Sequence, residues 1–486
     1  MAKITKQSEN FSKWYTDVIL DADLADYGPV KGTMVVKPYG FSLWTNIRDS
    51  LNKMIEDSGH DNAYFPLFIP KSFLEKEAKH VEGFAKECAV VTHSKLISEE
   101  GSLTVDPDSK LEEEIIVRPT SETIIWHMFK KWITSYRDLP LKVNQWANVV
   151  RWEMRTRLFL RTSEFLWQEG HTAHATKEEA MKETLEIVEI YRTLFEEYLA
   201  IPTIIGRKSN LERFAGAEET FSIETMMRDK KALQAGTSHY LGTNFGSAFD
   251  VKFQSKDNKE HPVYATSWGV STRMVGALIM VHGDDKGLKI PPKIAPTQVV
   301  IIPINPKKEK SEEFPSFVKK VKEKLTHLEI RTHIDDLNES PGYKFNKWEL
   351  KGVPIRIEIG LKEFKNMQVT VCRRDNSEKH QVQIDKIDEI PTILQSIQDN
   401  LFNDAKTFMD KNTCTVSTFA DFSDTMSKNN QFIKAYWDGT DETELKIKEK
   451  TKATIRCIVE DNEDSSNKCI FSGETAKHLV VFAKAY

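Results

Sequence analysis

The segment 148–176, NVVRWEMRTRLFLRTSEFLWQEGHTAHAT, constrains the fold more than any other part of the chain. It mixes arginine, glutamate and histidine with valine, leucine and aromatic residues. Alternate residues of a β-strand point to opposite faces of the sheet. With this period, one face carries Arg151, Glu153 and Arg155, and the apolar face carries Val150, Trp152 and Met154.

The same period returns in the second half of the segment, where Phe165, Trp167, Glu169 and His171 share a face. The pattern predicts an antiparallel pair of strands around a loop near 155–160. One face would pack on the core, and the other would display charged and aromatic side chains over a cavity.

A surface hairpin with cross-strand ion pairs is the structural alternative. The aromatic residues beside the charges favour a pocket with an apolar wall and a few polar contacts. Arginine in such a pocket suits a phosphate, which a guanidinium binds with two hydrogen bonds. His171 and His174 are three residues apart and would face opposite sides of a strand, so they do not indicate a shared metal ion.

Length, charge and termini exclude several classes of protein. The 486 residues carry a net charge of −5, so a nucleic-acid site would be a local patch. The N-terminal residues contain no apolar core of a signal peptide, and no run of 18 apolar residues exists. The five scattered cysteines favour a reducing compartment, and we expect the cytoplasm. The sequence contains neither a P-loop nor G-x-G-x-x-G, and we attribute TMSKN (425–429) to chance.

Two boundaries divide the chain into 1–288, 296–400 and 405–486. The first is the proline-rich stretch 287–296, and the second lies near 400–413. The first part mixes helices and strands, with a helix over 39–59 followed by an extended run over 62–70. A second helix begins at a Thr176/Glu179 capping box, and one face of it would carry Leu185, Val188, Tyr191 and Phe195.

The second part alternates strands and helices, which predicts an α/β sheet with helices on its faces. The expected strands are 299–304, 330–336, 353–360 and 367–374, and the expected helices are 311–328 and 387–402. The third part predicts a small α+β unit. It has a charged helix near 441–453 and strands over 453–461 and 478–486, and its apolar end should be tied down.

Six strings in order resemble the class II aminoacyl-tRNA synthetases, and within them the prolyl-tRNA synthetase family of archaeal and eukaryotic-like architecture. Residues 149–171 look like motif 2, 267–284 (SWGVSTRMVGALIMVHGD) like motif 3 with Arg273 as its arginine, and 39–70 like motif 1, the dimer element. RPTSE (118–122), FAGAEETFSIE (214–224) and ALQAGTSHYLG (232–242) complete the pattern.

The resemblance covers nearly the whole chain and implies a multidomain α/β protein. Its parts would be a catalytic domain with an antiparallel sheet flanked by helices, an α/β anticodon-binding domain and the small C-terminal domain. Arg151 and Arg273 are too close in sequence to enclose the large editing insertion of many bacterial-type enzymes. The absence of cysteine between 89 and 371 argues against the threonyl enzyme, whose pocket uses a zinc held partly by cysteine.

The implied reaction attaches proline to tRNA(Pro) in two steps, through prolyl-adenylate. Arg151 and Arg273 would be catalytic, and Mg²⁺ is expected with ATP. By resemblance, the ATP-binding residues are Arg151, Glu153, Arg161, Phe165, Gln234, Thr237 and Arg273. In this arrangement Phe165 stacks on adenine and Arg273 lies over its other face.

The resemblance also implies a small apolar pocket with acceptors for the imino group of proline. The proline-binding residues would be Thr120, Glu122, Arg151, Trp167, Glu169, His171, Phe214, His239 and Ser267. Because one methylene group is worth only about 1–3 kcal/mol of discrimination, we expect some misactivation of alanine or cysteine. Each residue has a structural alternative: Thr120 could cap a helix, and Trp167, Phe214 and His239 could be core residues.

The remaining implications concern partners. Residues 340–360 match the anticodon-domain signature, with Lys344, Lys347, Arg373 and Arg374 as candidate RNA contacts, and 39–70 would form a homodimer. The C-terminal domain of this group often binds zinc through four cysteines. Here the corresponding positions are Asp438, Thr443, Cys469 and Ser472, so we predict no zinc. Tyr486 would brace the catalytic domain near its site.

Three rivals remain open. A class II synthetase of another specificity would be separated by amino-acid-dependent ATP–pyrophosphate exchange. A non-catalytic tRNA-binding paralogue would usually lack the arginines of motifs 2 and 3. A purely structural dimer module would leave the charged strand face unexplained. We expect no membrane partner.

Overall fold

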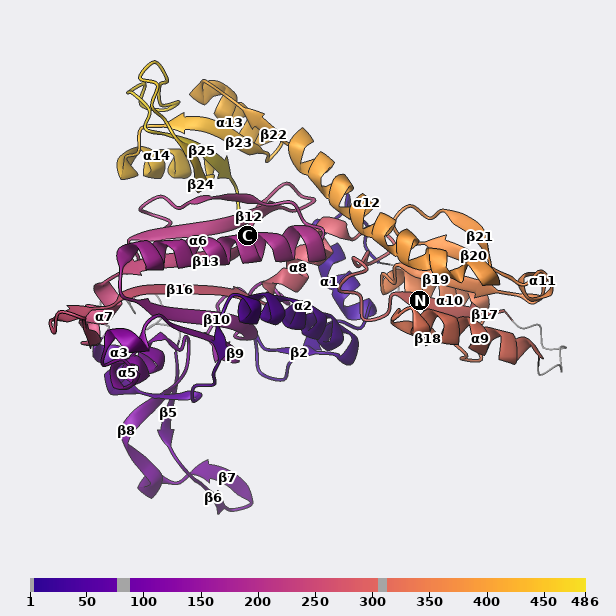
Figure 1. Cartoon of the computed structure of the whole chain (residues 1–486), viewed down its shortest axis with the longest axis horizontal. Helices are drawn as coiled ribbons and strands as arrows, with labels where there is room; N and C mark the ends of the chain where they lie inside the picture. Colours follow the sequence, from indigo (N-terminus) through magenta and orange to yellow (C-terminus); the bar gives the residue numbers. More distant parts are fainter. Residues whose placement is uncertain (1–3, 77–87, 305–312) are drawn as a thin grey trace.

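A computed structural model describes residues 4–76, 88–304 and 313–486. One large sheet runs through the molecule, with helices on both sides and a second, smaller lobe beside it (Figure 1). No helix of the described residues is long and apolar enough to cross a membrane.

The body of the molecule comprises α1 to α8, and its strands are short up to β8. The N-terminal elements are α1 (Phe11–Asp21), β1 (Ala25–Tyr27), β2 (Met34–Val36), α2 (Pro38–Asp57), β3 (Asp61–Asn62), β4 (Phe68–Pro70), α3 (Lys71–Lys76), β5 (Ala89–His93), β6 (Leu96–Glu99), β7 (Ser102–Val105) and β8 (Lys110–Val117). The helix predicted over 39–59 is confirmed as α2, which Pro38 begins.

The sheet-forming part of the body follows. Its elements are α5 (Glu122–Trp132), β9 (Leu141–Val150), β10 (Glu164–His174), α6 (Lys177–Thr193), β11 (Ile204–Arg207), β12 (Glu219–Met226), β13 (Ala232–Gly242), α7 (Asn244–Ala248), β14 (Lys252–Gln254), β15 (Glu260–Pro262), β16 (Tyr264–Ser271) and α8 (Arg273–His282). Strands β11, β12, β13, β16, β10 and β9 lie side by side in that order, and each pair is antiparallel.

The hairpin predicted from segment 148–176 is confirmed in its antiparallel pairing but not in its first strand. β9 ends at Val150, so residues 151–163 form the connection and the expected strand face of Arg151, Glu153 and Arg155 is wrong. Trp152 and Met154 do not pack on the core, because their side chains are 46% and 88% exposed.

The helix predicted to begin at Thr176 is confirmed as α6. The Thr176 side chain accepts a hydrogen bond from the Glu179 N–H at 3.2 Å. The Glu179 carboxylate reaches the N–H of Ala175 instead of Thr176, so the capping box is shifted by one residue. Val188, Tyr191 and Phe195 of the predicted face are buried, which confirms them, but Leu185 is 44% exposed and does not belong to that face.

The second lobe begins after α8 and contains a five-stranded sheet. Its elements are β17 (Val299–Pro303), α9 (Glu313–His327), β18 (Thr332–Ile334), α10 (Pro341–Leu350), β19 (Ile355–Ile359), α11 (Leu361–Lys365), β20 (Gln368–Arg373), β21 (Lys379–Gln383) and α12 (Ile390–Lys411). The α/β alternation is confirmed, since β17 pairs in parallel with β18 and β19. Residues 311 and 312 of the predicted helix lie outside the described residues.

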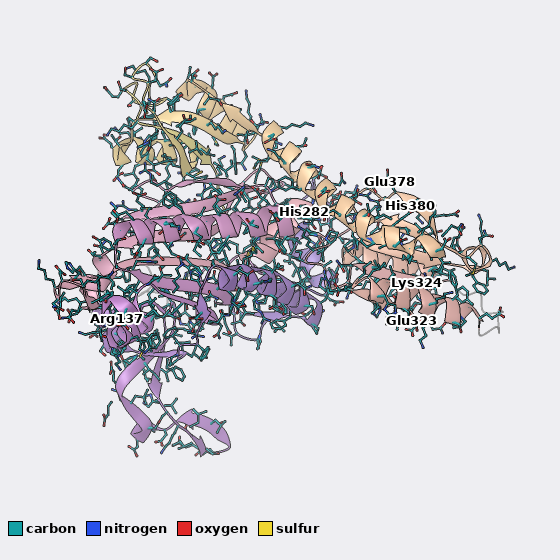
Figure 2. All side chains as sticks on the ribbon, in the orientation of Figure 1. Arg137, His282, Glu323, Lys324, Glu378 and His380 are labelled. Carbon is teal, nitrogen blue, oxygen red and sulfur yellow. The ribbon has the colours of Figure 1, made fainter. Side chains whose placement is uncertain are left out.

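Charged and polar side chains lie on two sides of the second lobe. Figure 2 places Glu323 and Lys324 on α9 and Glu378 and His380 at β21 on the opposite edge. Lys344 and Arg374 are buried, so the expectation of surface RNA contacts is wrong for these two residues.

Helix α12 runs without a break from the second lobe to the C-terminal lobe. That lobe contains β22 (Thr413–Thr415), α13 (Phe419–Lys428), β23 (Phe432–Trp437), α14 (Asp441–Thr451), β24 (Thr454–Asp461) and β25 (His478–Ala483). β24 pairs with β11 of the body, which extends the central sheet to eleven described strands. The chain end is tied down: the Tyr486 hydroxyl donates to Asp229 at 2.6 Å, and its N–H donates to Ala232 O.

Candidate active site

A cavity of about 330 Å³ lies over the central strands of the body. Three strands build its floor as rows of facing residues. In one row, Ser267 of β16 pairs with His171 of β10 on one side and with His239 of β13 on the other. In the next row, Gly269 pairs with Glu169 and Thr237 in the same way.

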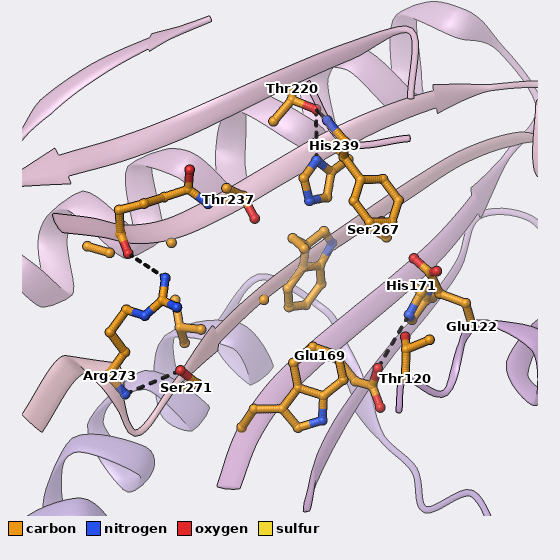
Figure 3. Close-up of a pocket in the computed structure, with 18 of the residues that line it drawn as sticks. Thr120, Glu122, Glu169, His171, Thr220, Thr237, His239, Ser267, Ser271 and Arg273 are labelled. Carbon is orange, nitrogen blue, oxygen red and sulfur yellow. Dashed lines mark hydrogen bonds and ion pairs between the residues drawn. The ribbon is translucent and has the colours of Figure 1, made fainter. Parts of the chain in front are cut away.

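A third row of paired residues lies at the end of the cavity near α8. Trp167 pairs with Ser271, and Arg273 begins the helix two residues later. The Ser271 hydroxyl accepts the Arg273 N–H at 3.2 Å, and the Arg273 guanidinium donates to Gln234 O at 3.3 Å. Figure 3 shows Arg273 and Thr237 at one end of the cavity, with His171, Glu122 and Thr120 at the other.

Glu169 is fixed by hydrogen bonds from Ser121, which precedes α5, and from Gln145 of β9. Its carboxylate accepts the Ser121 N–H at 3.2 Å and the Gln145 amide at 2.9 Å, and it lies 3.9 Å from His171 Nε2. Ser121 is the N-cap residue of α5, so the alternative of Thr120 as the cap is wrong, and Thr120 lines the cavity.

His239 forms the far wall together with Phe214. Their rings stack with centroids 4.5 Å apart, and Thr220 Oγ1 lies 2.9 Å from His239 Nδ1. Burial, with His171 nearby, lowers the pKa of His239 to about 3, so this ring is neutral at physiological pH.

The other end of the cavity is cationic. Burial, together with Arg161 and Arg151, lowers the pKa of Arg273 to about 10, which still leaves it charged at neutral pH. Arg151 lies over the rings of Phe165 and Trp167, with its guanidinium carbon 5.5 Å from each centroid, and its Nε donates to Pro119 O at 2.9 Å. An anionic ligand offsets such a concentration of positive charge.

Four buried polar atoms of the lining residues have no hydrogen-bond partner within the described chain. They are Trp167 Nε1, His171 Nδ1, Ser267 Oγ and Trp268 Nε1. A buried polar group without a partner costs about 1–3 kcal/mol, so these groups favour a polar ligand in the cavity.

The structure brings nearly all the candidate residues together. The cavity is lined by Thr120, Glu122, Arg151, Phe165, Trp167, Glu169, His171, Phe214, Gln234, Thr237, His239, Ser267 and Arg273. Glu153 and Arg161 do not line it. They face each other at 3.6 Å, and Arg161 lies with Arg273 and Tyr486 in an adjoining cavity of about 170 Å³.

The sequence analysis did not predict eight lining residues, of which Ala235, Gly236, Gly269 and Val270 are small or apolar strand residues. Ser271 follows Ser267 and Gly269 at strand period, and Thr220 lies within the motif-like string 214–224, so both carried a signal. Trp268 lines the cavity beside Gly170, where a Cβ atom would lie 2.1 Å from its ring. Glu212 carried no local signal.

The expected zinc positions of the C-terminal lobe converge without forming a zinc-like donor set. Asp438 Oδ2 accepts the hydroxyls of Thr443 at 2.8 Å and Ser472 at 2.6 Å, and its Oδ1 accepts from Thr440. A carboxylate so occupied, two hydroxyls and the Cys469 thiol do not fit a structural zinc site, which takes thiolate or imidazole ligands. No group of three or more His, Cys, Asp or Glu in the described chain is arranged to hold a metal ion.

Comparisons with known proteins agree with this geometry. Residues 104–282 match the tRNA synthetase class II core domain (G, H, P, S and T), 298–393 the anticodon binding domain, and 419–486 the prolyl-tRNA synthetase C-terminal family. The chain is 53% identical to the proline–tRNA ligase of Flavobacterium johnsoniae, over 99% of both chains. It is 52% identical to the corresponding ligase of Porphyromonas gingivalis, over 100% of this chain and 99% of the other.

A solved structure of prolyl-tRNA synthetase from Cryptosporidium parvum, complexed with halofuginone and AMPPNP, superposes with a TM-score of 0.93. Its sequence is 38% identical, and the match covers 100% of this chain and 99% of that one. The chain therefore belongs to the class II prolyl-tRNA synthetases.

Proposed function

We propose that the cavity over β10, β13 and β16 is where this proline–tRNA ligase joins ATP to proline before tRNA(Pro) is charged. The observation that carries the proposal is that the two ends of the cavity are lined by different kinds of side chain. Arginines gather where β16 meets α8, and carboxylates, hydroxyls and aromatic rings gather at the other end.

The arginine end is the proposed ATP end. Arg151 contacts the α-phosphate and the proline carboxylate, and Arg161 and Arg273 contact the outer phosphates. Phe165 stacks on adenine, with Arg273 over the opposite face. Glu153 orients this end through its contact with Arg161, 3.6 Å away.

Gln234 and Thr237 complete the ATP end as neutral ligands. Their side-chain oxygens fit a hard cation such as Mg²⁺, which accompanies ATP and supplies charge neutralisation at the phosphates when bound. Arg151 and Arg273 supply the positive charge that this chain itself contributes.

The other end is the proposed proline end. Trp167 and Phe214 form the apolar walls, and Thr120, Glu122 and Glu169 lie where acceptors for an imino NH₂⁺ are needed. His171, His239 and Ser267 form the row of the floor beneath them. The neutral state of His239 supports this role, because a charged ring would repel the cationic imino group.

The chemistry at the junction of the two ends requires placement more than a covalent nucleophile. A carboxylate oxygen of proline attacks the α-phosphorus, and pyrophosphate leaves. The hydroxyl of the tRNA 3′-terminal adenosine then attacks the proline carbonyl, and AMP leaves. Arg151 lies between the ends, beside Phe165 and Trp167, where charge develops in the first step.

The proposal also covers the architecture of the enzyme, its domain bounds, its location and its dimer. We infer the archaeal and eukaryotic-like architecture without an editing insertion, because strands and helices of the body account for the chain between β10 and α8. The domains span 1–288, 296–400 and 405–486. The enzyme works in the cytoplasm as a homodimer through 39–70, and its C-terminal lobe folds without zinc.

ATP–pyrophosphate exchange with each of the twenty amino acids tests the function. Proline should support the fastest exchange, and alanine and cysteine should be slower by at least about 10–200-fold in kcat/KM, since each missing methylene contributes discrimination of that order. Equal kcat/KM for proline and glutamate would contradict the pocket.

A further inference from the structure

The segment 208–218, between β11 and β12, supplies one wall of the cavity without being a helix or strand. Glu212 and Phe214 are its lining residues. Within the body, bonds hold the segment mainly at its two ends: the Lys208 N–H donates to Thr220 O at 2.8 Å, and the Glu218 N–H donates to Tyr240 O at 2.9 Å. Phe214 N–H donates to Thr220 Oγ1 at 3.2 Å, Asn244 donates to Gly216 O at 3.1 Å, and the Arg213 guanidinium donates to Glu218 O within the segment. An irregular segment in a binding site needs support from its surroundings to keep one geometry.

The C-terminal lobe gives that support where the segment begins. The Lys208 ammonium is buried and donates to Arg456 O of β24 at 2.7 Å and to Glu224 at 2.8 Å. The Ser209 hydroxyl is also buried and donates to the Glu444 carboxylate of α14 at 2.9 Å.

The same lobe contacts the segment again at the cavity wall. Glu212 lies 3.4 Å from Lys448 Nζ and 4.0 Å from Arg456 Nη1. The Asn210 amide donates to Asp441 at 3.4 Å.

One face of α14 makes three of these contacts. Asp441, Glu444 and Lys448 follow at spacings of three and four residues, which places them on one side of a helix. Lys446 belongs to the same helix but pairs with Glu442 at 2.6 Å and is 51% exposed. The helix therefore offers contacting and non-contacting residues within two turns.

We propose that the C-terminal lobe positions the amino-acid wall of the cavity, with Glu444, Lys448 and Arg456 as positioning residues that act through segment 208–214. The inference rests on the proposed function, because it assigns Phe214 to the proline end. It adds a role for a lobe whose residues do not themselves line the cavity.

The test uses the full-length enzyme carrying Glu444→Ala and Lys448→Ala together. Loss of the contacts should let segment 208–214 move, so KM for proline should rise about tenfold while KM for ATP stays within about twofold. Pyrophosphate exchange measures both constants. Glu444→Gln keeps an acceptor for Ser209 and should retain the parent values, and Lys446→Ala is the matched control on the non-contacting face.

A second measurement does not depend on turnover. Amide hydrogen exchange of 208–214 should be faster in the double variant than in the parent and in Lys446→Ala. Unchanged KM for proline together with unchanged exchange would overturn the inference. Equal rises in both KM values would also overturn it, because they indicate a general loss of structure. Lys448→Ala alone, at a half-exposed position, gives the same comparison if the double variant does not fold.

If the parent enzyme shows no proline-dependent exchange, the proposed function fails. The hydrogen-exchange comparison still tests whether the lobe positions the segment.

Discussion

The body meets its two neighbouring lobes through interfaces of different kinds. Towards the second lobe, the Arg374 guanidinium binds both carboxylate oxygens of Asp284, at 2.7 and 2.9 Å, and Asp284 is 33% exposed. Towards the C-terminal lobe, Glu224 is fully buried between Lys208 and Arg456, and β24 continues the sheet of the body.

The two interfaces differ in which charged groups lose their partners when the lobe separates from the body. When the interface with the second lobe opens, the partly exposed Asp284 exchanges its partner for water at small cost, although Arg374 is itself buried. A buried carboxylate between two cations leaves uncompensated charges in the interior if one member is lost. Burial alone would raise the pKa of Glu224, but Lys208 and Arg456 hold it below its ordinary value, so the group stays ionised. The C-terminal lobe is thus a structural part of the catalytic body, and the second lobe is docked beside it.

The largest loss of stability is expected when the buried carboxylate of Glu224 is removed. Glu224→Ala leaves Lys208 and Arg456 without their common partner and should lower the free energy of unfolding by about 3–5 kcal/mol. Urea unfolding measures this loss. Glu189→Ala, which removes a surface pair on α6, should change stability by no more than about 1 kcal/mol. Similar values for the two variants would contradict the account of this interface.

A smaller effect is expected at the other interface. Arg374→Ala removes a two-bond contact with a partly exposed carboxylate and should cost about 1–2 kcal/mol in the same measurement. The variant should keep the parent KM for proline and ATP, because the contact lies outside the cavity-lining set. A loss as large as that of Glu224→Ala would remove the distinction between the interfaces.

A pH-dependent effect sharpens the description of the C-terminal interface. Burial, with the Glu212 and Asp441 carboxylates nearby, raises the pKa of Glu444 to about 7, although Ser209 and Lys448 act in the opposite direction. The folded protein therefore keeps this proton while the unfolded chain, with an ordinary value near 4.5, releases it. Stability should fall as pH rises from about 4.5 to 7 and level off above that range.

Glu444→Gln removes this titration. Compared with the parent, the variant should gain stability between pH 5 and pH 8, by about 1 kcal/mol or more. Thermal or urea unfolding at several pH values measures the difference. A constant difference across this range would show that Glu444 does not titrate there.

We expect no change in stability from metal removal. Asp438, Thr443 and Ser472 bind one another by hydrogen bonds and do not form a zinc-like donor set, so treatment with EDTA should leave Tm unchanged. Elemental analysis of the purified enzyme should find no zinc. One zinc per chain would contradict this prediction.

The sequence predicted elements of both lobes, including α14, β24 and β25 of the C-terminal lobe, but not how that lobe joins the body. β17 is buried on both faces and α9 has a clear apolar side, so their local patterns matched the fold. The pairing of Arg207 with Ile458 joins strands 251 residues apart and leaves no local signal. The extension of the central sheet into the C-terminal lobe was therefore not predicted.

The cavity residues were predictable where a strand carried them, as in Phe165 to His171 of β10. The pattern failed beyond Val150, because alternation in a loop imitates a strand but loop residues such as Met154 are free to face solvent. Glu212 was missed because its position depends on Lys448 and Arg456, which lie far along the chain.

The most direct test of the central claim is a pair of variants, one at the proline end of the cavity and one in the adjoining cavity beside its arginine end, studied by proline-dependent pyrophosphate exchange. Glu122→Gln should raise KM for proline about tenfold or more, since it weakens a charge-assisted hydrogen bond, and should leave KM for ATP within about twofold. Arg161→Ala should raise KM for ATP and spare proline. If both variants raise both constants equally, or neither changes them, the cavity does not bind ATP and proline at separate ends.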